Sequence, residues 1–240
     1  ISLEQRIGEY WFAQLGIVVM LIGLFFLITY VFTEFGPFWQ TVIGYGITVL
    51  VYSLSRLKQE RYKLISNSLL PGSFLLLYFV TLRMHFFQEN PIITGKSAAL
   101  GILLVVLGLQ FYIAWRSRSQ WLMFIPILLG YLTALLSDTH HFALVTIFFT
   151  ALMAALLLSI YHWHYLGLSS IVLSYSAFLL YLLNNPLIGG QIQILPEHDW
   201  ILVYLVITLI VYTLVSFRPG VNQYLNPPTR ILLTTLNSSG

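Results

Sequence analysis

Residues 17–31 read IVVMLIGLFFLITYV, and residues 98–106 read AALGILLVV. Both stretches are continuously apolar, whereas the strands of a transmembrane β-barrel alternate apolar and polar residues. A backbone inside a lipid bilayer has to satisfy its own hydrogen bonds, which restricts spanning segments to helices or closed barrels. The two stretches therefore predict an all-α protein whose helices cross a membrane.

The composition of the whole chain supports this fold class. Of the 240 residues, 58% are hydrophobic and only 8% are charged, whereas a soluble domain carries about 25% charged residues. So few charges cannot cover the surface of a water-soluble fold of this length. The lipid bilayer is therefore the predicted partner of the apolar surface, and a lipid or small solute is the predicted kind of ligand.

The charged residues and the absence of cysteine exclude several function classes. The net charge of +3 is spread over short turns between apolar stretches, which argues against a nucleic-acid-binding surface. The chain has no cysteine, so disulfides, thiolate metal sites and cysteine nucleophiles are excluded. The sequence contains no nucleotide-phosphate loop, zinc-protease helix or serine nucleophile elbow. No cofactor and no bound metal are predicted.

Eight stretches are long and apolar enough for membrane-spanning helices, which need about 20 residues each. We expect them to form one polytopic transmembrane domain over residues 1–240, built from successive helical hairpins. A further apolar stretch begins at Arg230, and we expect it to be the truncated start of a ninth helix in a longer parent chain. The predicted spans are residues 11–32, 38–57, 67–87, 97–115, 121–136, 142–161, 166–183 and 200–217.

The distribution of lysine and arginine predicts the orientation of these spans. With the N-terminus in the cytoplasm, nine basic residues fall on the cytoplasmic side, and only Arg83 and Lys96 fall outside. Cytoplasmic loops of membrane proteins carry an excess of basic residues, so we expect a cytoplasmic N-terminus. The nine residues are Arg6, Arg56, Lys58, Arg61, Lys63, Arg116, Arg118, Arg218 and Arg230.

Two further patterns concern the spans themselves. Tryptophan prefers the membrane–water interface, and all six tryptophans lie near predicted span ends: Trp11, Trp39, Trp115, Trp121, Trp163 and Trp200. Small residues at helical spacing predict close contacts between helices, although such smooth faces could instead slide during transport. The pairs are Gly16 and Gly23, Gly101 and Gly108, Ala151 and Ala155, and Ser170 and Ser174.

Two predicted external connections carry carboxylates and histidines that could meet at the membrane surface. Such side chains can bind a metal or act as acid and base, which would suit an enzyme. Some of them can instead cap a helix, as aspartate does at helix N-termini, and adjacent histidines on a helix point in different directions. Both interpretations remain open. The members of this external cluster are Asp138, His140, His141, Glu197, His198 and Asp199.

Arg83 and His85 form a second candidate site, towards the outer end of the third predicted span. An arginine at the centre of a membrane helix costs about 2.5–3.5 kcal/mol, so an intramembrane charge marks a candidate functional residue. Arg83 either extends to the outer interface or contacts an anion or a lipid headgroup together with His85. Glu34 or Glu89 is the expected partner in the second case.

The N-terminal third of the chain carries a recognisable set of features. Residues 2–8 read SLEQRIG, glycines occur in the first span at Gly16 and Gly23, and a Gly36-Pro37 turn follows. With these features, residues 2–86 resemble a bacterial family of multi-pass membrane proteins, the domain of unknown function 2339. Members of that family tend to carry an arginine soon after the Gly-Pro turn, where this chain has FWQT. The resemblance implies a bacterial inner-membrane location and a longer parent chain, and it implies no particular reaction.

Three function classes are compatible with these features. The first is a non-enzymatic, transporter-like or envelope-assembly module that handles a lipid, a glycan or a small solute. A lipid-filled groove or a polar cavity would favour it. The second is an integral membrane transferase acting on a lipid-linked substrate at the outer face, which convergence of His140, His141 and His198 on one pocket would favour. The third is a structural scaffold for membrane partners, which a closed bundle would favour.

Overall fold

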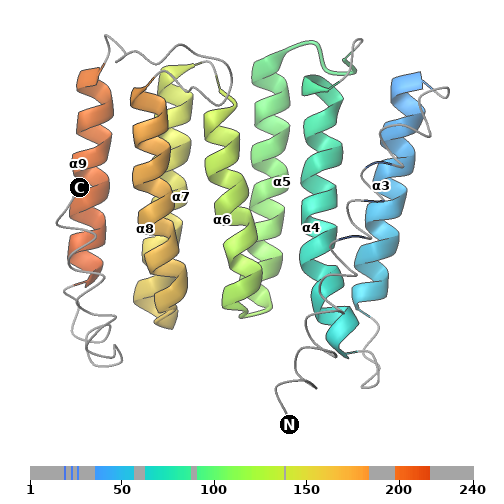
Figure 1. The fold of residues 1–240 in the computed structure, drawn as a ribbon, viewed down its shortest axis with the longest axis horizontal. Helices are drawn as coiled ribbons and strands as arrows, with labels where there is room; N and C mark the ends of the chain where they lie inside the picture. Colours follow the sequence, from blue (N-terminus) through green and yellow to red (C-terminus); the bar gives the residue numbers. More distant parts are fainter. Residues whose placement is uncertain are drawn as a thin grey trace. The chain divides into compact units, whose positions relative to one another are not determined.

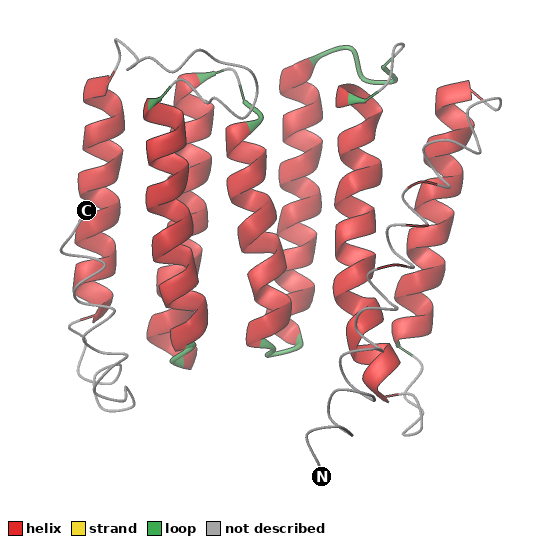
Figure 2. Cartoon of the chain, viewed as in Figure 1, coloured by secondary structure: helices red, strands yellow, loops and turns green. Residues whose placement is uncertain are grey.

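The chain is all-α across the residues that the structure describes. The computed structural model describes residues 36–56, 63–87, 91–137, 139–183 and 198–216, together with Val19, Gly23 and Phe26. These residues hold seven helices and no strand (Figures 1 and 2), which confirms the fold class predicted from the apolar stretches. The helices are α3 (Gly36–Ser55), α4 (Lys63–Phe86), α5 (Lys96–Arg116), α6 (Gln120–Leu135), α7 (His140–Tyr161), α8 (His164–Leu182) and α9 (His198–Ser216).

The chain divides into two compact units, residues 1–112 and residues 113–240, with the boundary inside α5. In the first unit, α3 and α4 pack side by side (Figure 1). Their apolar contact is built from Val51, Leu69 and Leu76. A polar contact joins the same two helices further along.

That polar contact is centred on Tyr45 of α3. Its hydroxyl lies 3.0 Å from Thr81 Oγ1 of α4 and donates to Met84 Sδ at 3.4 Å. In the same unit, Gln110 Nε2 of α5 donates to the carbonyl of Phe74 in α4 at 3.0 Å. Polar side chains inside membrane helices commonly bond across to a neighbouring helix. These contacts therefore tie α3 and α5 to α4.

The second unit is a bundle in which α7 contacts each of α6, α8 and α9. In α7, 56% of the segment long enough to span a membrane is buried. Its small residues Ala151 and Ala155 are buried, and they share one core with Leu158, with Ile171 of α8 and with Tyr212 of α9. Small side chains let helices approach closely, so the packing predicted for the alanine pair is confirmed.

Two glycines of the second unit mark very close approaches between helices. A Cβ added at Gly130 of α6 would lie 2.8 Å from Oγ1 of Thr150 in α7. A Cβ added at Gly167 of α8 would lie 2.8 Å from Cδ2 of Leu158 in α7. Protein interiors are close-packed, so extra atoms at these points force the neighbours to move. The helices of this unit are therefore held as close together as glycine allows.

The glycine pair predicted to pack in α5 has a different environment. A Cβ added at Gly101 or Gly108 would meet no described atom within 4 Å. Val105, which lies between them in sequence, is 72% exposed. The predicted close contact is thus not made by any described residue. Glycine spacing marks a smooth face, and it does not say whether a protein helix covers that face.

Four helical segments are long and apolar enough to cross a membrane, which makes this a helical membrane fold. Two further helical segments, Gln120–Leu135 and Trp200–Ser216, are apolar but shorter. The predicted number of eight spans is therefore wrong for the described residues, which supply four to six. The four long segments are Leu69–Phe86, Lys96–Arg116, His141–Tyr161 and His164–Leu182.

The lower number has identifiable causes. The spans expected at residues 11–32 and after Arg230 lie outside the continuously described residues. The helix α3 has 20 residues, but polar Gln40 and Thr41 in its first turns lower its mean hydropathy. The helix α6 has 16 residues, so it is about 24 Å long at 1.5 Å per residue. The hydrocarbon core of a bilayer is about 30 Å thick.

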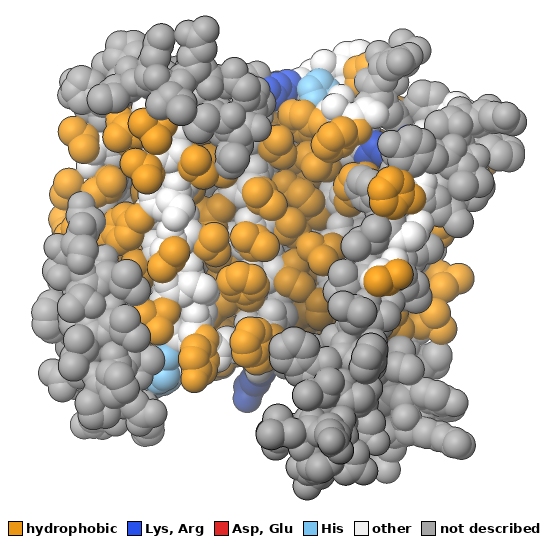
Figure 3. Space-filling model, viewed as in Figure 1, with side chains coloured by type: hydrophobic (Ala, Val, Ile, Leu, Met, Phe, Trp, Pro, Cys, Tyr) orange, Lys and Arg blue, Asp and Glu red, His pale blue; other side chains and the backbone are white. Residues whose placement is uncertain are grey.

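The surface of the described helices is mainly apolar. On the face shown in Figure 3, apolar side chains line the helices, and the basic side chains lie towards helix ends. Exposed large apolar residues occur on every helix, including Val49 of α3, Phe149 of α7 and Leu214 of α9. Soluble monomers rarely expose contiguous apolar surface on this scale. Such a surface is stable when lipid chains surround it.

Candidate functional site

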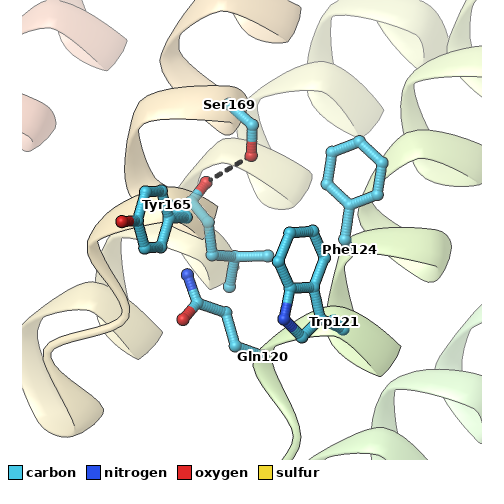
Figure 4. A pocket seen from close by; sticks show the side chains of 6 residues that line it. Gln120, Trp121, Phe124, Tyr165 and Ser169 are labelled. Carbon is cyan, nitrogen blue, oxygen red and sulfur yellow. Dashed lines mark hydrogen bonds between the residues drawn. The ribbon is translucent and has the colours of Figure 1, made fainter. Parts of the chain in front are cut away.

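A cavity of about 290 Å³ opens between the first turns of α6 and α8, within the second unit (Figure 4). Of the residues that α6 contributes, Gln120 and Phe124 are four positions apart, which places them on one side of the helix. Most of the lining is aromatic or aliphatic. The lining residues are Gln120, Trp121 and Phe124 from α6, and Tyr165, Leu166 and Ser169 from α8.

Two polar side chains of the cavity, Ser169 and Gln120, are bonded to α8. Ser169 Oγ donates to the carbonyl of Leu166 at 3.0 Å, the dashed contact in Figure 4. With its amide oxygen turned towards α8, Gln120 accepts from the backbone N–H groups of Tyr165 at 3.0 Å and Leu166 at 2.8 Å. The first N–H groups of a helix have no partner inside that helix. Gln120 therefore caps α8 and holds the starts of α6 and α8 together.

The turn before α6 has a defined conformation. Ser119 is the N-cap of α6, and its Oγ accepts from the N–H of Leu122 at 3.3 Å. Arg118 has a positive φ of 49°, a left-handed conformation that is uncommon for residues other than glycine. Its N–H donates to the carbonyl of Trp115 at 3.0 Å. This turn places the Cα of Arg118 within about 8 Å of that of Gln120, because successive Cα atoms are 3.8 Å apart.

Aromatic side chains surround this end of the second unit. Trp121 is 77% exposed and Tyr165 is 69% exposed. On the adjoining helix ends, Trp115 Nε1 donates to the hydroxyl of Tyr161 at 2.7 Å. The ring of Tyr161 stacks on the ring of Trp163, with the two ring centroids 4.9 Å apart. Tryptophan and tyrosine concentrate at membrane interfaces. The cavity thus has the surroundings of an interfacial site.

The other described tryptophans follow the predicted pattern. Trp39 lies in the first turn of α3, and Trp200 lies in the first turn of α9. Both are exposed. The placement of tryptophan near helix ends is confirmed for five residues, whereas Trp11 lies outside the described residues.

The external cluster predicted from the sequence is only partly described. The ring of His141 meets the ring of Trp200 with centroids 5.7 Å apart, so the starts of α7 and α9 lie side by side. Among the described residues, no group of three histidine, aspartate or glutamate side chains could hold a metal. An acid–base or metal role for the cluster stays a prediction. Its members outside the description are Asp138 and Glu197, and the side chains of His140, His198 and Asp199.

Arg83 and His85, the second predicted site, contact neighbouring protein groups. Arg83 is only 7% exposed, and its guanidinium donates to the amide oxygen of Gln40 in α3 at 2.5 Å. Arg83 therefore contacts the neighbouring helix and does not extend into solvent. His85 Nδ1 lies 2.7 Å from the carbonyl oxygen of Ile93. A role for the two residues in binding an anion or a headgroup stays a prediction.

A hydrogen-bonded chain of hydroxyl groups crosses the core of the second unit. The hydroxyl of Tyr131 in α6 lies 2.9 Å from Ser170 Oγ in α8, which lies 2.7 Å from the hydroxyl of Tyr212 in α9. All three side chains are buried. Leaving a buried polar group without a partner costs about 1–3 kcal/mol. The chain of hydroxyls therefore favours one register of α6, α8 and α9. Its middle member, Ser170, follows the cavity residue Ser169 in sequence.

Of the cavity residues, the sequence singled out only Trp121, as a tryptophan near a span end. Gln120, Phe124, Tyr165 and Ser169 lie in or beside two turns that the sequence marks only as aromatic and basic. The available signal was the pair of aromatic residues that flanks each turn, Trp115 with Trp121 and Tyr161 with Tyr165. The pairing of α6 with α8 brings the two turns together, and periodicity within one helix does not report that pairing.

These features define the class of the protein as a helical membrane protein with an apolar cavity at one end of its second unit. No protein-family model matches the chain, and no curated protein and no solved structure matches it either.

Proposed function

We propose that this protein is a multi-pass membrane module that handles a lipid, and that the cavity between α6 and α8 seats part of an acyl chain. The observation that carries the proposal is the cavity itself, about 290 Å³ in volume and lined mainly by aromatic and aliphatic side chains. Pockets for whole drug-sized ligands measure about 300–1,000 Å³. The volume of this cavity lies just below that range, which suits one segment of a chain.

The polar groups of the cavity favour a lipid over a glycan or a polar solute. Specific recognition of a hydroxylated ligand requires polar groups that are free to bond it. Here the hydroxyl of Ser169 is bonded within α8, and the amide oxygen of Gln120 caps α8. An acyl chain requires no hydrogen bonds. Its contact with Trp121 and Phe124 would remove apolar surface from water, which is favourable.

The proposal includes a location, the inner membrane of a bacterium with the N-terminus in the cytoplasm. The excess of lysine and arginine in alternate connections supports this orientation, and the resemblance of residues 2–86 supports the bacterial membrane. The cavity adjoins the turn between α5 and α6, which carries Arg118 and follows Arg116. On this orientation, it therefore opens towards the cytoplasmic leaflet.

Filling the cavity is expected to reduce lipid binding. Ser169→Phe adds an aromatic ring to the cavity wall, and its own hydroxyl contact lies within α8. Native mass spectrometry of the purified full chain in detergent should show at least about a fivefold loss of tightly bound phospholipid. A fivefold loss corresponds to about 1 kcal/mol, the scale of one or two excluded methylene groups.

Val105→Phe is the matched control, because Val105 lies on an exposed face of α5. It introduces the same ring and should leave lipid occupancy unchanged. Phe124→Trp narrows the cavity from the α6 side and should act like Ser169→Phe. If both cavity variants unfold at the same temperature as the parent and retain its full lipid occupancy, the proposed function is wrong.

A further inference from the structure

We infer that the cavity between α6 and α8 selects an anionic glycerophospholipid, whose phosphate lies against Arg116 and Arg118 while an acyl chain enters the cavity. This inference rests on the proposed lipid-handling function and adds the chemical class of the headgroup. The observations that carry it are the position of the two arginines, the distribution of carboxylates and the hydrogen-bonding groups beside the cavity.

The two arginines lie two and four positions before Gln120, the first cavity residue of α6. Arg116 ends α5, Arg118 lies in the turn, and both are exposed. The left-handed conformation of Arg118 and the N-cap at Ser119 define the path of this turn into Gln120. Two arginines therefore lie within four positions in sequence of Gln120, a residue of the cavity wall. The arginine fork matches the geometry of phosphate oxygens, which it can bind with two parallel hydrogen bonds.

No acidic residue is close in sequence to compensate these charges. Residues 113–137 and 139–183 contain no aspartate or glutamate. The carboxylates between residues 113 and 240 are Asp138, Glu197 and Asp199, which follow α6 in sequence or lie at the start of α9. The start of α7, which follows Asp138, lies beside the start of α9. Within the described residues of the second unit, the helices α6, α7 and α8 thus carry no carboxylate.

The hydrogen-bonding groups beside the cavity also favour an acceptor-rich ligand. The guanidinium groups of Arg116 and Arg118 can only donate hydrogen bonds. The indole N–H of the exposed Trp121 is a donor only. A phosphate diester offers acceptors and a negative charge, so it complements these groups. The first N–H groups of α8 are already bonded to Gln120, so the attraction comes from the arginines and not from the helix end.

The adjoining apolar cavity decides between a lipid and a free phosphate ion. A free ion gains nothing from contact with Phe124 and Leu166. A phospholipid uses both features at once, since its phosphate and its acyl chain are covalently joined. Anionic lipids are enriched in the cytoplasmic leaflet, where they attract basic residues. The proposed orientation places the cavity in that leaflet.

The test uses two lipids with identical acyl chains. The purified full chain in neutral detergent is mixed with equal amounts of dioleoyl phosphatidylglycerol and dioleoyl phosphatidylcholine, and bound lipids are counted by native mass spectrometry. Each basic residue beside an anionic headgroup strengthens binding about fivefold. With two arginines, we expect the abundance of the phosphatidylglycerol complex to exceed that of the phosphatidylcholine complex by a factor of about 5 to about 25.

Variants assign the preference to the arginines. Arg116→Gln combined with Arg118→Asn removes both charges, and asparagine tolerates the left-handed conformation at position 118. This variant should bind the two lipids equally while keeping its total lipid occupancy. Arg56→Gln is the control, because Arg56 directly follows α3, outside the second unit, and its guanidinium donates to the hydroxyl of Tyr52 at 2.8 Å. It should keep the parent's preference.

Each contrary outcome has a separate meaning. Equal binding of the two lipids by the parent chain would overturn the anionic selectivity and leave the proposed lipid function standing. An unchanged preference for phosphatidylglycerol in the double arginine variant would show that the two arginines do not bind the headgroup. Displacement of phosphatidylglycerol by excess inorganic phosphate would show a free-phosphate site and overturn the lipid assignment. The absence of any bound lipid, in the parent and in the cavity-filling variants alike, would instead overturn the proposed function.

Discussion

Gly130→Val is expected to lower the free energy of unfolding by about 1–3 kcal/mol, the usual cost of overpacking a core. The Cβ would lie 2.8 Å from Oγ1 and 3.1 Å from Cγ2 of Thr150 in α7. Thr150 cannot turn away without cost, because its side chain is β-branched and Oγ1 donates to the carbonyl of Thr146 at 2.8 Å. The helices α6 and α7 must therefore separate. Unfolding of the purified protein in mixed micelles, followed by circular dichroism, measures the loss.

The control for this substitution is Gly101→Val in α5, where a Cβ meets no described atom within 4 Å. Both variants replace a helical glycine by valine, so the intrinsic helix preference changes equally. Thr150→Ala in the Gly130→Val background removes the two clashing atoms and should recover part of the lost stability. Equal effects at positions 130 and 101, or no recovery with Thr150→Ala, would show that this helix contact is not as close as described.

Ser170→Ala is expected to destabilise the second unit by about 1–3 kcal/mol. It removes the hydroxyl that joins Tyr131 to Tyr212 and leaves the fully buried Tyr212 without that partner. Tyr131 retains a longer contact to the carbonyl of Ser170 at 3.3 Å. Ser169→Ala is the matched control on the adjacent residue, because Ser169 bonds only within its own helix among the contacts described. It should change stability much less.

A double-mutant cycle isolates the contact between Ser170 and Tyr212. If their hydrogen bond carries the effect, Ser170→Ala combined with Tyr212→Phe should cost less than the sum of the two single substitutions. The shared bond is then lost only once. Strict additivity in the same unfolding assay would mean that the two hydroxyls do not stabilise each other.

The fold class was predictable because it depends on composition and continuous apolar stretches. The same holds for Ala151 and Ala155, whose small size at helical spacing predicts burial in any bundle, and for the tryptophans at helix ends. These signals lie within one helix and need no knowledge of its neighbours. The structure therefore confirms the predictions made from them.

Features that depend on helix pairing were not predictable. The glycines that pack closely are Gly130 and Gly167, whereas the sequence favoured Gly101 and Gly108. The cavity was missed because Gln120 of α6 caps α8, and the two residues that it bonds are more than 40 positions away in sequence. The number of spans was overestimated because hydropathy does not register that α6 ends after 16 residues.

The helix α6 carries half of the cavity wall, so the position of the cavity in the membrane depends on whether this short helix crosses the bilayer. A helix of about 24 Å can cross a bilayer only if the bilayer thins locally or flanking residues reach the interface. Exposed Trp121 at its start is suited to that role. If α6 crosses, the turns at Ser119 and at Thr139 lie on opposite sides of the membrane, and the cavity opens on the side of Ser119.

Single-cysteine labelling tests this directly, because the chain has no native cysteine. Ser119→Cys and Thr139→Cys place one thiol on each side of α6. With a membrane-impermeant maleimide on intact cells, we expect Thr139→Cys to react and Ser119→Cys to react only after permeabilisation. Reaction of both thiols in intact cells, of neither, or of Ser119→Cys alone would contradict a membrane-crossing α6 with the cavity in the cytoplasmic leaflet.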